Sequence, residues 1–153
     1  ALAYTAAEAH PDELAHQIRQ FLSCCGILDA KGQAEVEIAL AEALINAVDY
    51  GCLELKQSEK APDLSSPSIY HTKRKERIAD PAWGNREIKI RIVLNRHKLA
   101  FHVMDPGPGI PKRIARPHEI MPYGRGIQMM RELVDKVIIR RKPSVITLIK
   151  YRG

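Results

Sequence analysis

The stretch Ile88-Lys-Ile-Arg-Ile-Val-Leu94, continued by Asn95-Arg-His-Lys98 and Leu99-Ala-Phe-His-Val103, decides the fold. Apolar residues recur at every second position on both sides of the turn, which is typical of strands with one buried face. Because the chain turns back within a few residues, two antiparallel strands fit this segment best. A parallel Rossmann sheet, which needs crossover helices between consecutive strands, is therefore disfavoured.

Helical periodicity is found on both sides of this hairpin. Three segments carry apolar residues at helical spacing, namely residues 11–25, 29–51 and 127–137. Pro11 suits a first helical position and Gly26 an end, although the capping pattern from Thr5 to Glu8 offers an alternative start. Val145 to Tyr151 is predicted to be a closing strand.

These elements predict one α/β domain spanning residues 1–153. Helices combined with a meander of strands indicate a two-layer α/β sandwich, whose antiparallel or mixed sheet is covered by helices on one face. The chain is long enough to bury a core without disulfides or metals. From about Lys56 to Arg86 periodicity disappears, and we expect a partly mobile insertion with room for one short helix.

Composition limits the function classes. Lys and Arg number 24 against 18 Asp and Glu, and this net charge of +6 is spread along the chain without a nucleic-acid-binding motif. A solvated basic surface is thus expected, and nucleic acid is disfavoured as a partner. With no run near the roughly 18 apolar residues of a membrane helix and no signal-peptide pattern, we expect a cytoplasmic protein.

Two features concern the state of the chain. The three cysteines Cys24, Cys25 and Cys52 cannot all pair, and their spacing does not resemble a zinc site, so reduced thiols are expected. Because the chain begins with Ala1 rather than Met, we expect an excised domain or a processed chain.

The first candidate binding loop is Asp105-Pro-Gly107-Pro-Gly109-Ile110. An acid ends a strand, and glycines follow at alternate positions, where backbone can approach a ligand closely. Asp, Pro and Gly also form ordinary turns after strands, so this loop by itself leaves both interpretations open.

The second candidate feature is Glu42-Ala-Leu-Ile-Asn46 in the second helix. Side chains four residues apart project from the same helix face. One interpretation is a hydrogen-bonded pair on the helix surface. The functional interpretation is a carboxylate that acts as a base beside an amide oxygen that binds Mg²⁺, a cation preferring oxygen ligands.

The third candidate feature is Tyr123-Gly124-Arg125-Gly126-Ile127. Glycines here open a helix whose first amides can bind an anion. Arg125 would add positive charge for phosphate, but an exposed loop arginine is an equally good interpretation.

Together these features resemble the GHKL (Bergerat-fold) ATPases and kinases in order and approximate spacing. Residues 42–51 look like the family's N box, residues 105–110 like its first glycine box and residues 124–130 like its second. Residues 144–150 are similar to its final strand, where Ser144 takes the position of a Thr that commonly contacts the adenine pocket. The resemblance covers nearly the whole chain apart from the insertion.

The branch within the family is indicated by Glu42. Histidine kinases usually carry Asn at this position, whereas the ATPases and the anti-sigma-factor serine kinases carry Glu. The compact length and the second glycine box, followed by Leu133-Val134-Asp135, look most like the anti-sigma serine kinase branch. The inserted segment resembles that of a bacterial subgroup of the family in which such a domain is attached to a response-regulator receiver domain.

The resemblance implies a site for ATP and Mg²⁺. Asp105 would accept from the adenine amino group, Asn46 would ligate Mg²⁺, and Glu42 would be the catalytic base. The nucleotide would further contact the residues Gly107, Gly109, Ile110, Gly124, Arg125, Gly126, Ile127 and Ser144.

The implied partners are an anti-sigma-factor antagonist as phosphate acceptor and a sigma factor as competing ligand, with a homodimer and an attached receiver domain as further expectations. A nucleotide-dependent switch with little turnover and a histidine-kinase fragment remain as alternatives.

Three departures bear on turnover. Tyr50 replaces a His that often ends the N box, and Pro143 replaces a Gly that often precedes the final strand. The expected ATP lid, between Ile110 and Tyr123, is short and contains Pro111, Pro117 and Pro122, so its closure is expected to differ from the family's usual case.

Overall fold

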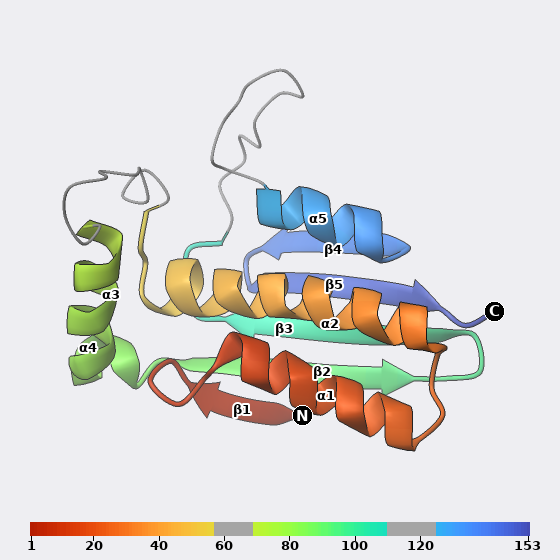
Figure 1. Cartoon of the computed structure of the whole chain (residues 1–153). Coiled ribbons are helices and arrows are strands. Elements are labelled where there is room, and N and C mark those ends of the chain that lie inside the picture. Colours follow the sequence, from red (N-terminus) through yellow and green to blue (C-terminus); the bar gives the residue numbers. More distant parts are fainter. Residues whose placement is uncertain (57–68, 110–124) are drawn as a thin grey trace.

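A computed structural model describes residues 1–56, 69–109 and 125–153 of the chain. In this part of the chain a five-stranded sheet is covered on one face by helices, as Figure 1 shows. All four strand pairings are antiparallel, in the order β1-β2-β3-β5-β4. The strands are β1 Leu2–Thr5, β2 Glu87–Leu94, β3 Lys98–Asp105, β4 Lys136–Arg141 and β5 Ser144–Tyr151. The predicted two-layer α/β sandwich is confirmed.

The described helices follow local start signals in the sequence. They are α1 Pro11–Cys24, α2 Ala30–Ile45, the π-helix η1 Asn46–Cys52, α3 Ile69–Ala79, α4 Pro81–Gly84 and α5 Arg125–Leu133. Pro11 occupies the first turn of α1, and the Asp29 side chain caps α2 by accepting from the amide of Gly32 at 2.7 Å. Because η1 continues α2 directly, the second predicted helix is confirmed through Gly51.

The predicted hairpin is present as β2 and β3. Leu94 pairs with Leu99, and the Asn95 side chain accepts from the amides of His97 and Lys98 at 2.8 and 2.9 Å. An Asn that binds backbone amides two and three residues ahead stabilises a turn. This local bonding explains why the chain reverses at Asn95.

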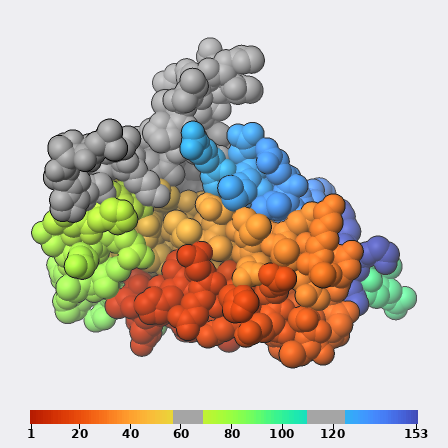
Figure 2. Space-filling view, viewed as in Figure 1, coloured from red at the N-terminus to blue at the C-terminus, as the bar shows by residue number. Residues whose placement is uncertain are grey.

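The core lies between the sheet and α2. Leu40, Leu44 and Val48 are fully buried, as are Ile88 and Phe101 on the facing strands. The space-filling view in Figure 2 shows α1 and α2 side by side over this face. Burial of this helix stripe holds the polar residues of α2 and η1 at a fixed height above the sheet.

The structure differs from the prediction at the end of the third helix and in an additional N-terminal strand. The third helix ends at Leu133, and Val137, predicted to be helical, belongs instead to strand β4. Val134 and Val137 are three residues apart, so they fit a helical stripe, but Val137 and Ile139 alternate with exposed residues in an edge strand. Strand β1 was not predicted, because its four residues are too few to show a period.

The Thr5 to Glu8 pattern forms a reciprocal capping arrangement but does not start a helix. The Thr5 amide and hydroxyl both donate to the Glu8 carboxylate, at 3.2 and 2.9 Å, and the Glu8 amide donates to the Thr5 hydroxyl. Helix α1 begins later, at Pro11. The same hydrogen bonds therefore stabilise a turn between β1 and α1.

The insertion contains more regular structure than predicted. Its described part forms α3 and α4 rather than one short helix, and residues 57–68 lie outside the described residues. Within the described ranges, no helix is both long and apolar enough to cross a membrane.

Candidate functional site

Two of the predicted elements, the N-box helix and the first glycine loop, meet at the end of strand β3. Asp105 is the last residue of β3, and its carboxylate lies against Gly51 of η1 so closely that a Cβ atom on Gly51 would be 2.3 Å from Cγ of Asp105. A Cβ atom on Gly107 would be 2.5 Å from the carbonyl oxygen of Gly51. The N-box helix and the first glycine loop thus touch through positions that only glycine fits.

The Asp105 carboxylate is held by two donors. The Gly107 amide donates to Oδ1 at 2.8 Å, and the Ser144 hydroxyl donates to Oδ2 at 2.9 Å. Burial raises the pKa of Asp105, while these two hydrogen bonds act in the opposite direction. Each oxygen keeps a further lone pair. Asp105 is therefore a fixed, partly desolvated acceptor that can take one more donor.

Glu42 and Asn46 lie together opposite the start of α5. Both side chains are half-buried on one face of the helix formed by α2 and η1. A Cβ atom on Gly126 would be 2.7 Å from Oε2 of Glu42 and 3.9 Å from Nδ2 of Asn46. The first turn of α5, anchored by buried Ile127, consequently faces both polar side chains, while Arg125 is exposed.

The two glycines of the first loop approach the protein's own backbone. Gly107 lies against Gly51, and a Cβ atom on Gly109 would be 2.9 Å from the carbonyl oxygen of Arg141. Gly109 also has a φ of +83°, which glycine adopts without strain. Their small size is thus required by packing between η1 and the β4–β5 hairpin. Ile110 and Gly124, also predicted to contact the nucleotide, lie outside the described residues.

Two groups lie beside this site that the sequence did not place there. Cys52 is fully buried, and burial together with the nearby Asp105 carboxylate raises its pKa to about 12. Asp49 is a buried acid that receives hydrogen bonds from Tyr70 and Arg74 of α3. A polar residue within the apolar run around Ala47 and Val48 was the signal that could have found Asp49.

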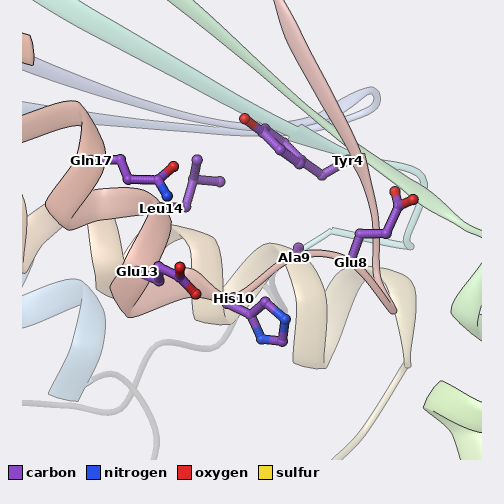
Figure 3. A pocket seen from close by; sticks show the side chains of 7 residues that line it. All are labelled: Tyr4, Glu8, Ala9, His10, Glu13, Leu14 and Gln17. Atoms are coloured by element: carbon purple, nitrogen blue, oxygen red, sulfur yellow. The ribbon is translucent and has the colours of Figure 1, made fainter.

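A separate small pocket lies where β1 leads into α1, away from these residues. Its volume is about 160 Å³, and Figure 3 shows its lining side chains, Tyr4, Glu8, Ala9, His10, Glu13, Leu14 and Gln17. None of the predicted site residues lines it.

Comparison with known proteins identifies the family. Residues 4–150 match the model of a family described as the histidine kinase-like ATPase domain. The match includes every predicted site residue, from Glu42 to Ser144. A search of curated proteins found no match.

Proposed function

Because the chain belongs to the histidine kinase-like ATPase domain family, which binds ATP, we propose that it is a Mg²⁺-dependent serine/threonine protein kinase of the anti-sigma-factor type. The observation that supports this most is the interlock of Asp105, Gly51 and Gly107, which presents a fixed acceptor beside the N-box helix. The alternative is an ATP-dependent switch with little turnover.

The Asp105 carboxylate suits the adenine amino group. Its two existing donors leave one lone pair free on each oxygen. Because desolvation raises its pKa, an additional donor would offset part of the penalty for burying the charge. GTP carries a carbonyl acceptor where ATP carries the amino donor, so the same carboxylate would disfavour guanine.

Asn46 and the start of α5 suit the phosphates. Mg²⁺ commonly takes one or two protein oxygens together with substrate phosphates, and the Asn46 amide oxygen would supply a protein ligand. When bound, Mg²⁺ would neutralise charge on the transferred phosphoryl group. The amides of Gly126 and Ile127, with those of Gly124 and Arg125, would hold the γ-phosphate end.

Glu42 is the proposed catalytic base. Glu42 lies on the same helix as Asn46 and faces Gly126 of α5. An acceptor hydroxyl that enters over α5 would therefore meet both Glu42 and Asn46. Glu42 would take the proton as the acceptor oxygen forms its bond to the γ-phosphorus, while the bond to the β-bridging oxygen breaks and ADP leaves.

The proposed acceptor is a serine or threonine of a small anti-sigma-factor antagonist, with a sigma factor as competing ligand. Glu42, instead of the Asn usual in histidine kinases, supports this branch. Tyr50, in place of the usual His, favours the switch, because it removes an imidazole near the phosphates.

Incubation with labelled ATP and candidate antagonists, followed by mapping of the phosphorylated residue, separates these functions. Transfer to Ser or Thr supports the kinase. Label on His would favour the histidine-kinase alternative, and tight ATP binding without transfer to any antagonist would favour the switch.

A further inference from the structure

A buried carboxylate joins η1 to the helical segment that follows it. Asp49 is 6% exposed, and each of its oxygens has a donor from α3. Arg74 Nε donates to Oδ1 at 2.9 Å, and the Tyr70 hydroxyl donates to Oδ2. Burial and the neighbouring carboxylate raise the pKa of Tyr70, so the hydroxyl keeps its proton as a donor. Removing one partner would leave a buried charge incompletely paired.

The same segment holds the C-terminal end of η1. Arg77 Nη1 donates to the carbonyl of Leu53, and Arg86 Nη1 donates to the carbonyl of Cys52 at 3.0 Å. Both guanidinium groups lie 4.2 Å from the ring centroid of Trp83. Carbonyls at a helix end lack intrahelical donors, and cations are favourable there. Both the middle and the end of η1 are thus tied to residues 70–86. Figure 1 shows α3 and α4 at the end of the molecule where the helix formed by α2 and η1 ends.

The helix held in this way carries the candidate site. Asn46 lies three residues before Asp49, and Gly51, which contacts Asp105, lies two residues after it. A π-helix is a rare conformation found mostly in short pieces, often at functional sites. The orientation of Asn46 and Gly51 therefore depends on what fixes η1.

We propose that residues 69–86, comprising α3, α4 and Arg86 beyond them, position the nucleotide site, and that Arg74 acts on that site through Asp49. The inference rests on the proposed ATP site. Arg74 is a positioning residue in this proposal, because its guanidinium binds the carboxylate of Asp49 and not a reacting group.

The test compares the affinity of Mg-ATP for four forms of the whole chain by titration calorimetry. Arg74→Ala should weaken Mg-ATP by about 10- to 100-fold, the range typical when a group that orients a ligand-binding residue is lost. Tyr70→Phe keeps the ion pair between Arg74 and Asp49 and should weaken Mg-ATP binding less than Arg74→Ala does. Lys75→Ala removes the same charge from an exposed position of α3 and should match wild type.

Hydrogen exchange at a temperature where each variant is folded gives the second readout. Amides of Asn46 to Cys52 should exchange faster in Arg74→Ala, while those of α1 stay as in wild type. If Arg74→Ala does not fold, Tyr70→Phe decides by the same two measurements.

Faster exchange in η1 with unchanged Mg-ATP affinity would overturn the proposal, because the contacts would then be structural only. A Lys75→Ala effect as large as that of Arg74→Ala would overturn it too. Failure of wild type to bind ATP would instead reject the proposed function.

Discussion

The Asp105 carboxylate lies directly on the backbone of Gly51, with no space for a side chain between them. A Cβ atom on Gly51 would be 2.3 Å from both Cγ and Oδ1 of Asp105. This contact fixes the distance between the N-box helix and the end of β3. It also makes Gly51 a sensitive position for mutation.

Gly51→Ala should lower the free energy of unfolding by about 1–3 kcal/mol, because overpacking forces the carboxylate or the helix to move. Denaturant unfolding measures this. The same mutation in an Asp105→Gly background should cost much less, because the clashing atoms are gone. Equal costs in both backgrounds would show that Asp105 is not the obstacle.

Asp105→Asn should weaken ATP binding by at least ~1.5 kcal/mol, since a hydrogen bond to a charged acceptor is lost and the amide is mispaired. Titration calorimetry with ATP and GTP measures the change. Wild type should prefer ATP, and the preference should shrink in the mutant. Wild-type protein that binds GTP as tightly as ATP would contradict the adenine assignment.

Asp105 should also affect stability through pH. Since burial raises its folded-state pKa above the ordinary value of 3.8, the folded protein binds the proton more tightly than the unfolded chain. Ionisation of Asp105 therefore lowers the free energy of unfolding as pH rises through the folded-state pKa. Acidification protonates Asp105 and restores that stability. Relative to Asp105→Asn, the wild type should gain stability as pH falls toward the unfolded pKa.

Glu37 provides the comparison of opposite sign in the same denaturation series. The Arg19 hydrogen bond, assisted by His16, holds the pKa of Glu37 below its ordinary value despite some burial. The stabilisation that ionised Glu37 provides is fully present above its unfolded-state pKa and is lost as pH falls through its folded-state pKa. A wild type that loses stability relative to both Asp105→Asn and Glu37→Gln on acidification would contradict the Asp105 assignment.

Much of the fold could be predicted from periods in the sequence. The hairpin was predicted because Ile88, Ile90 and Phe101 alternate with polar residues around a turn. The end of α5 was misplaced because Val134 and Val137 satisfy a helical period as well as a strand period. Where the period is ambiguous or the element very short, tertiary pairing decides.

The candidate site could be predicted in part for a different reason. Asp105, Glu42 and Asn46 stand in local motifs, whereas the contacts of Asp49 span 21 and 25 residues to Tyr70 and Arg74. A segment without periodicity lies between them, so no local rule links these residues. The packing of Gly107 against Gly51 likewise becomes visible only in three dimensions.

Glu42→Gln should retain ATP affinity but lower phosphoryl transfer by on the order of 10² or more, the effect expected for removing a positioned base. Single-turnover transfer to the antagonist, with affinity measured separately, tests this. Asn46→Ala is the contrasting variant, because loss of a Mg²⁺ ligand should weaken Mg-ATP binding itself. Undiminished transfer by Glu42→Gln would show that another group is the base.

The three thiols should differ sharply in reactivity. Cys24 and Cys25 are exposed, whereas Cys52 is fully buried with its pKa raised to about 12 by burial and by the Asp105 carboxylate. The thiolate is the reactive form, so the raised pKa leaves Cys52 with far less thiolate at pH 8 than an ordinary exposed cysteine has, even before access is considered. A disulfide reagent should therefore label two thiols quickly and the third only as the protein opens.

Cys52 labelling also reports on the end of η1, because Arg86 binds the Cys52 carbonyl there. In Arg86→Ala the slow phase should accelerate, while the two fast thiols react as before. Saturating ATP should slow the labelling of Cys52 in wild type, because a ligand bound against Asp105 stabilises the native state, in which Cys52 is buried. Three equally fast thiols in the folded wild type would contradict the buried position of Cys52 beside the nucleotide site.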